Sequence, residues 1–186
     1  MKEVMITSGA NGALSCFINA LINKGDEVVL FEPAFPMLFD HIEMSGGTIK
    51  TVPLEENNEE WSFDPNVLRS VLSDNTKLLV MNSPHNPTGK LFTLEEQLEI
   101  TEILEDFPNC VVLSDEVYDK LVFDDKEHVS FASLGDNWDR TVTLYSGGKL
   151  FLSTGWKVGW AIGPQRIVRL GGIINMATSY CSNHPA

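Results

Sequence analysis

Short apolar runs of strand length alternate with helix-like stretches along this chain, and no other feature constrains the fold as strongly. Six runs are rich in β-branched or aromatic residues, at 27–31, 48–52, 77–82, 111–114, 141–145 and 156–162. Stretches at 13–22, 65–72, 94–107 and 167–177 favour helices. This order is typical of a mostly parallel sheet sandwiched by helices, so we predict one α/β domain over residues 1–186.

Local sequence signals define one of these helices and one loop more closely. The helix at 94–107 is preceded by Thr93, which has Glu96 at capping-box spacing, and Pro108 follows its end. The short acidic segment at 55–60 is typical of a solvated loop. We therefore expect an ordered helix at the first position and no regular structure at the second.

Composition excludes several classes of partner. A net charge of −13 and a sequence pI near 4.6 disfavour nucleic acid and anionic membranes. No apolar run approaches the ~20 residues that cross a bilayer, and no basic leader precedes the first strand-like segment. We expect a cytoplasmic protein, with mitochondria as the alternative for a longer parent. Cys16, Cys110 and Cys181 are far apart and odd in number, so we expect buried free thiols and neither disulfides nor a metal site.

Polar or glycine-rich segments stand near the start of the chain, at residues 8–12, and after three predicted strands, at 82–89, 115–118 and 146–149. In an open parallel sheet, ligands bind beyond the carboxyl ends of the strands, so these segments are expected at one edge. Each has an ordinary structural explanation. Asn86 lies in a turn sequence, Asp115 could cap a helix, Tyr118 could be a core aromatic and Lys149 a solvated lysine. Their joint position at strand ends favours a shared site.

The four segments together meet the needs of one cofactor, pyridoxal 5'-phosphate. This cofactor requires a lysine amine for a Schiff base, an anion at its ring nitrogen, donors to its ring oxygen and a cradle for its phosphate. Lys149 offers the amine, and Asp115 the anion that keeps the ring nitrogen protonated. Asn86 and Tyr118 are suitable donors. The loop at 8–12 leads into a helix whose first N–H groups could hold phosphate, with help from Ser146 and Lys157.

Three motifs carry a resemblance to a known family: NSPHNPTGK at 82–90, SDEVY at 114–118 and SGGKLFLSTGWKVGW at 146–160. The chain resembles class I/II aminotransferases of fold type I, and most closely their kynurenine aminotransferase and cysteine-conjugate β-lyase branch. The resemblance covers essentially the whole chain. It implies that Lys149, Asp115 and Tyr118 are catalytic. It implies cofactor binding by Ala10, Asn11, Phe35, Asn86, Asp115, Tyr118, Ser146, Lys149 and Lys157.

Within that set, the resemblance assigns particular roles. Ala10 and Asn11 match a loop of backbone amides, and Phe35 matches an aromatic that stacks on the cofactor ring. Trp156 and Trp160 are expected in the core instead. Asn11 stands where this branch often has an aromatic residue, which alters the expected substrate pocket.

The resemblance implies transfer of an amino group from an amino acid, of kynurenine, aromatic or glutamine type, to a 2-oxo acid, by a homodimer. It also implies that the chain is a partial large domain. An N-terminal arm, and a C-terminal domain with an arginine for the substrate carboxylate, lie outside it. Two alternatives stay open: a cysteine-S-conjugate β-lyase, and a truncated chain that binds cofactor or pairs with full-length subunits without turnover.

A serine acyl-enzyme is a further alternative, from Ser146-x-x-Lys149 and the triplet Ser73-Asp74-Asn75. The order of these motifs argues against it, and its Lys-Thr-Gly element is absent from the sequence. Glu116, next to Asp115, is expected to matter much less than Asp115, because neighbouring residues of a strand point to opposite faces.

Overall fold

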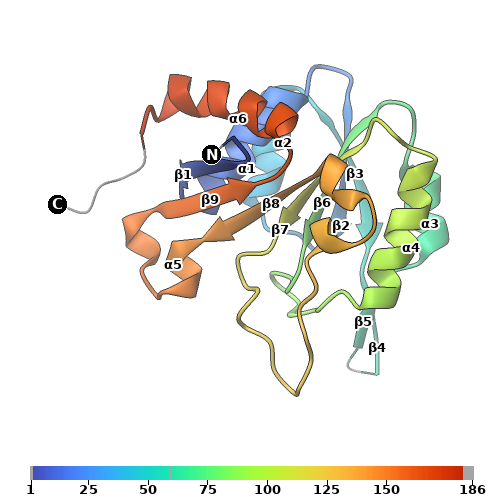
Figure 1. Ribbon diagram of the computed structural model, residues 1–186. Helices are drawn as coiled ribbons and strands as arrows, with labels where there is room; N and C mark the ends of the chain where they lie inside the picture. The colour runs from blue at the N-terminus through green and yellow to red at the C-terminus, as the bar shows by residue number, and fades with distance from the viewer. Residues whose placement is uncertain (1, 59, 182–186) are drawn as a thin grey trace.

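The structure is a computed structural model that describes residues 2–58 and 60–181 (Figure 1). In this part of the chain a seven-stranded sheet has the order β1-β9-β8-β7-β6-β2-β3. Its strands are β1 (Val4–Ser8), β2 (Glu27–Glu32), β3 (Thr48–Pro53), β6 (Thr76–Asn82), β7 (Val111–Asp115), β8 (Thr141–Ser146) and β9 (Val158–Ile162). Strands β3, β2, β6, β7 and β8 pair in parallel, whereas β9 is antiparallel to both β8 and β1. The predicted mostly parallel α/β sheet is confirmed.

Helices cover both faces of this sheet (Figure 1). One face packs against α1 (Gly9–Leu21), α2 (Met37–Ser45) and α6 (Gln165–Thr178), and the other against α3 (Pro65–Val71) and α4 (Leu94–Glu105). Alternate residues of the central strands serve the two faces: Leu78 and Val80 belong to the first core, Leu79 and Met81 to the second. Burial on both faces explains why these strands read as continuous apolar runs.

Several local predictions are confirmed and others are wrong. Thr93 and Glu96 form the predicted capping box at the start of α4. The acidic segment is not a simple loop, because β4 (Glu55–Asn57) pairs with β5 (Glu60–Ser62) in an antiparallel hairpin. Its glutamates are nevertheless exposed, since the pairing satisfies backbone groups and buries little side-chain surface.

The strand predicted at 156–162 begins at Val158, because a 3₁₀ turn, η3 (Thr154–Trp156), precedes it and Lys157 adopts a left-handed conformation. Trp156 is 57% exposed, so its expected place in the core is wrong, while Trp160 is half-buried and stacks on Tyr145. Cys16 and Cys110 are buried, but Cys181 is exposed. Among the helices of the described residues, none is both long and apolar enough to cross a bilayer.

Candidate active site

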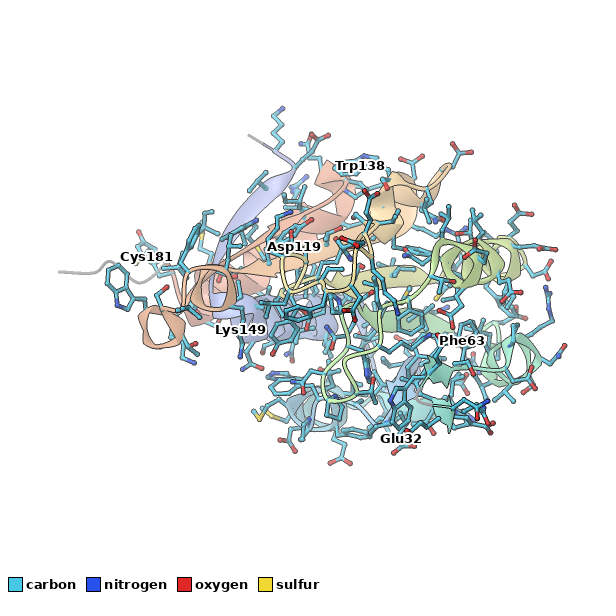
Figure 2. The ribbon with its side chains drawn as sticks, turned by 90° about the horizontal axis from the view of Figure 1, so that it is seen from below. Glu32, Phe63, Asp119, Trp138, Lys149 and Cys181 are labelled. Atoms are coloured by element: carbon cyan, nitrogen blue, oxygen red, sulfur yellow. The ribbon has the colours of Figure 1, made fainter. Side chains whose placement is uncertain are left out.

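The topology explains how distant segments reach one edge of the sheet. Because β9 runs antiparallel to both of its neighbours, β1 and β8 point the same way, and β1 ends at the edge where the parallel strands end. The segments after β1, β2, β6, β7 and β8 therefore meet there, together with the residues that enter β9. Figure 2 views the molecule from below, the side toward which the loop after β7 extends in Figure 1, and Lys149 lies on this side.

A cavity of about 200 Å³ opens at this edge. All nine residues predicted to bind a cofactor line it: Ala10, Asn11, Phe35, Asn86, Asp115, Tyr118, Ser146, Lys149 and Lys157. They come from six different segments of the chain. Several further residues also line the cavity, among them Ser8, Asn82, Val117 and Thr154, to which the sequence analysis gave no individual role.

The start of α1 forms one wall of the cavity. Gly9 has a positive φ of 71°, which places the first turn of the helix against β9. Gly159 makes this approach possible, because a Cβ on it would lie 2.5 Å from the Gly9 carbonyl carbon. The first N–H groups of a helix lack acceptors within the helix, so those of Ala10 and Asn11 can hold an anion. Lys157 adds a cation beside them.

Asp115 ends β7 and is 9% exposed. The pKa of its carboxyl is raised to about 7, mainly by burial and to a lesser extent by the neighbouring charge of Glu116. The backbone N–H of Val117, 3.4 Å from Oδ1, and the charge of Lys149 act in the opposite direction. Such a carboxylate would gain from a cationic partner in the cavity, because that partner would offset the cost of burying the charge.

Lys149 lies in the short helix α5 (Gly147–Leu150), which directly follows β8. Its side chain enters the same cavity, and its Nζ lies 5.4 Å from the centroid of the Tyr118 ring. Gly148 lets the next turn approach closely, since a Cβ there would lie 2.8 Å from the Cα of Thr154. The site therefore combines a reachable primary amine with a buried carboxylate.

Asn82 connects two of the lining segments and was missed as a site residue. Its Nδ2 donates to the backbone oxygen of Asp115 (2.8 Å), and its Oδ1 accepts from the backbone N–H of Asn86 (2.6 Å). It thereby fixes the Asn86 turn to the end of β7. Its position as the last residue of a predicted strand was the available signal.

Asn11 has a partner from α2 that the sequence did not reveal. His41 is 9% exposed, and its Nε2 lies 3.0 Å from Asn11 Oδ1. Burial lowers the pKa of His41, with an opposing effect of Asp40, so the ring is neutral at neutral pH. A carboxamide oxygen only accepts hydrogen bonds, so His41 donates through Nε2–H. This bond leaves the amide NH₂ of Asn11 free to donate elsewhere.

The serine acyl-enzyme alternative fails on placement. Ser73, Asp74 and Asn75 directly precede β6, whereas Ser146 and Lys149 lie at the end of β8 or just after it. Since β6 and β8 run parallel through β7, the two motifs lie at opposite edges of the sheet. Ser73 Oγ donates to Glu27 instead (2.6 Å). One catalytic centre cannot include both motifs.

Comparison with known proteins gives consistent matches. The family model described as "Aminotransferase class I and II" matches residues 1–186. The chain is 41% identical to kynurenine–oxoglutarate transaminase of Dictyostelium discoideum over 94% of its length, and 43% identical to kynurenine–oxoglutarate transaminase 1 of Rattus norvegicus over 91%. These matches cover 43% and 42% of the two relatives, so the chain spans less than half of their length.

Solved structures match over nearly the whole chain. N-succinyldiaminopimelate aminotransferase from Mycobacterium tuberculosis superposes with a TM-score of 0.95 at 36% identity, over 98% of this chain and 47% of that one. An aromatic aminotransferase from Pyrococcus horikoshii gives a TM-score of 0.91 at 32% identity, over 97% and 48%. The matched proteins share an architecture and differ in the substrates that their names state.

Proposed function

We propose a function from the premise that this chain belongs to the class I and II aminotransferases, whose family model matches its full length. The chain supplies the cofactor-binding part of a pyridoxal-phosphate enzyme that moves an amino group from an amino acid to a 2-oxo acid. One observation carries the proposal. The amine of Lys149 and the buried carboxyl of Asp115, whose pKa is raised to about 7, line one cavity with the start of α1.

The residues present fit this cofactor. Asp115 would hold the ring nitrogen, whose positive charge would offset the cost of burying the carboxylate. Asn86 and Tyr118 would donate to the ring oxygen, and Phe35 would pack on the ring face. The N–H groups of Ala10 and Asn11, with Ser146 and Lys157, would hold the phosphate.

When bound, pyridoxal phosphate supplies a carbonyl that condenses with amines and a cationic ring that withdraws electrons. The chain's own residues supply the rest. Lys149 would hold the cofactor through its amine and, as a free amine, would accept a proton from the substrate Cα and return it. Asp115 would keep a proton on the ring nitrogen, and Tyr118 would donate to the ring oxygen.

The relatives suggest the substrate class. The four proteins compared above are all named as transaminases or aminotransferases: two name kynurenine, one an aromatic substrate and one N-succinyldiaminopimelate, so a β-lyase is not the favoured alternative. We propose an aromatic or kynurenine-type donor. Asn11, held by His41, places an amide at the cavity where it could meet a polar group of the donor.

Labelling of the lysine tests the proposal. Purified protein should be yellow after incubation with pyridoxal phosphate, and borohydride reduction should fix a pyridoxyl group on the peptide that contains Lys149. A Lys149→Ala variant should give neither result. Label on another lysine of the wild type would contradict the assignment.

We also propose that further protein covers the site, as a second copy or as other segments of the parent protein. Phe151 and Leu152, next to Lys149, are 70% and 95% exposed, which is costly for apolar side chains left in water. We expect the 186-residue chain to capture cofactor better than it transfers amino groups, because no residue here has been assigned to hold the substrate carboxylate. Light scattering measures whether the chain associates. The absorbance of the bound cofactor and an assay with an aromatic donor measure cofactor capture and amino transfer.

A further inference from the structure

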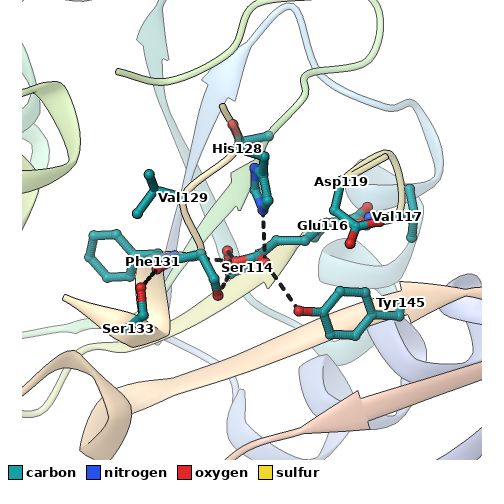
Figure 3. Close-up of polar contacts among 12 residues, drawn as sticks. Ser114, Glu116, Val117, Asp119, His128, Val129, Phe131, Ser133 and Tyr145 are labelled. Atoms are coloured by element: carbon teal, nitrogen blue, oxygen red, sulfur yellow. Dashed lines mark hydrogen bonds and ion pairs between the residues drawn. The ribbon is translucent and has the colours of Figure 1, made fainter. Parts of the chain in front are cut away.

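Glu116 lies directly behind the candidate active site, on the opposite face of the chain from Asp115. Its carboxylate is 1% exposed and accepts hydrogen bonds from five groups of the protein (Figure 3). Oε1 accepts from Ser114 Oγ (2.8 Å), Ser130 Oγ (2.9 Å) and Phe131 N–H (3.3 Å), and Oε2 from His128 Nε2 (3.0 Å) and Tyr145 OH (3.3 Å). We call these six residues the Glu116 cluster.

Two contacts of the cluster, those of Phe131 and His128, require an acceptor on Glu116. The N–H of Phe131 can only donate, so Oε1 must accept. The other ring nitrogen of His128, Nδ1, is buried and without a hydrogen-bond partner among the described residues. A bare lone pair in that position costs less than an N–H would, so Nε2 carries the proton and donates to Oε2. A carboxylate suits this arrangement and a carboxamide does not.

The members of the cluster are interleaved with residues of the cavity. Ser114 precedes Asp115, and Tyr145 precedes Ser146, so these two cluster residues are each next to a cavity residue on the same strand. Glu116 itself stands two residues before Tyr118. Since neighbouring strand residues point to opposite faces, a constraint on one side fixes the orientation of the other.

The cluster also closes a loop. Residues 117–130 leave β7 and return to the sheet, and His128, Ser130 and Phe131 attach the returning end to Glu116 at the departing end (Figure 3). Tyr118 lies in the first turn of this loop, where the N–H of Leu121 donates to its backbone oxygen (2.7 Å). The loop that carries Tyr118 is therefore held at both ends by one side chain.

We propose that Glu116 is a positioning residue, which joins the loop 117–130 and β8 to the end of β7 and so holds Asp115, Tyr118 and Ser146 in the arrangement that receives the cofactor. This inference rests on the proposed function. Glu116 does not line the cavity, so it acts through its neighbours.

A Glu116→Gln variant tests the proposal with little change in shape. Either orientation of the new amide creates a mismatch. With its NH₂ toward Ser130 and the Phe131 N–H, two donors face each other. With its NH₂ toward His128, the proton of the ring must move to Nδ1, where it finds no acceptor. The matched control is Glu127→Gln, the same change at an exposed residue of the same loop.

Three measurements on the full chain separate positioning from general stability: the dissociation constant of pyridoxal phosphate, the pH at which the visible band of the Lys149-bound cofactor titrates, and hydrogen exchange of amides 117–131. Glu116→Gln should weaken cofactor binding about tenfold, since the competent arrangement is less populated. The midpoint pH of the visible band should rise, because a displaced Tyr118 no longer donates a hydrogen bond to the deprotonated ring oxygen of the cofactor. Exchange should accelerate, and Glu127→Gln should change none of the three.

The outcomes distinguish this proposal from the proposed function. A wild-type chain that forms no band at Lys149 would overturn the proposed function, and hydrogen exchange would still test the attachment of the loop. A Glu116→Gln variant that binds cofactor within twofold of wild type, with an unchanged midpoint, would overturn the positioning role. If Glu116→Gln does not fold, Ser130→Ala, which removes one donor, should show a smaller change in the same direction, and no change there would refute the proposal.

Discussion

Asp115 and Glu116 are neighbouring carboxyl groups at the end of one strand, and their surroundings are opposite. Glu116 faces inward to five donors, whereas Asp115 faces a cavity, where the Val117 N–H approaches it at 3.4 Å. Burial raises the pKa of Asp115 to about 7. A buried acid with its partners in place holds a structure together, and one that faces an open cavity is prepared for a ligand.

The largest effect should come from removing the charge on the cavity side. Asp115→Asn should lower turnover with an aromatic donor about 1000-fold, because the ring nitrogen loses the anion that keeps it protonated. The fold should persist, since the amide replaces the carboxyl in a site with few fixed partners. Steady-state kinetics beside circular dichroism measure the two properties. The control is Asp124→Asn, an exposed residue with a positive φ that Asn tolerates. Near-normal turnover in Asp115→Asn would contradict the role of Asp115 as the anion at the ring nitrogen.

Removing the charge on the inner side should act on stability instead. Glu116→Ala leaves five donors without their acceptor and should lower the free energy of unfolding by about 4 kcal/mol. Chemical denaturation with urea measures this loss, with Glu127→Ala as the exposed control. A loss equal to that of the control would mean that the Glu116 cluster contributes little to the fold.

The two acids should also differ in how they link stability to pH. The pKa of Asp115 is raised in the folded, cofactor-free chain, so the folded state binds more protons than the unfolded state between about pH 4 and pH 7. Stability should therefore fall as pH rises through this window, by roughly 3 kcal/mol from this group, and change no further above it. Asp115→Asn should remove that part of the slope and be the more stable protein at pH 8. Denaturation curves of the wild type and of Asp115→Asn at pH 4 and pH 8 test this. A wild type that is more stable than Asp115→Asn at pH 8 would contradict the prediction.

Two tyrosines provide the smallest and most closely matched comparison. Tyr118 lines the cavity, and Tyr145 donates to Glu116 from the other side. Tyr118→Phe should weaken cofactor binding about tenfold and leave the free energy of unfolding of the cofactor-free chain nearly unchanged. Tyr145→Phe should lower that free energy by about 1 kcal/mol, with less effect on the cofactor. Cofactor titrations and thermal melts on both variants measure these two effects. A larger loss of cofactor binding in Tyr145→Phe and a larger loss of stability in Tyr118→Phe would contradict the separate roles of the two tyrosines.

The sequence predicted the residues that line the cavity better than the residues that hold them in place. Motifs near strand ends, together with the family resemblance, identified nine residues that the fold brings to one cavity, because a parallel sheet places strand ends together. Asn82, His41 and the Glu116 cluster were missed as contributors, since their roles depend on contacts between distant segments. Glu116 was expected to matter little because it points away from Asp115. That direction is confirmed, but the residue lies in a buried network and not in solvent.

Elements of the fold were predicted where their pattern was local. Central strands with continuous apolar sequence were found to within two residues. Strand β1 and helix α2 were not assigned, because in β1 the apolar Val4 and Ile6 are exposed while Thr7 is buried, and α2 follows a proline-rich turn. The β4–β5 hairpin was missed because its exposed, charged residues carry no apolar alternation.

The pairing of β1 with β9 has a consequence for the order of folding. Residues 4–8 hydrogen-bond with residues 158–162, and Gly9 rests on Gly159, so the anion-binding wall joins segments that are among the most distant in sequence. Closing so long a loop costs conformational entropy, so β1 and β9 are expected to pair late in folding. On the ribosome, β1 must wait until β9 has emerged. The central parallel strands can assemble before that moment, but the cavity cannot. Cofactor capture is therefore expected to follow the pairing of β1 with β9, and its rate would report when that pairing forms.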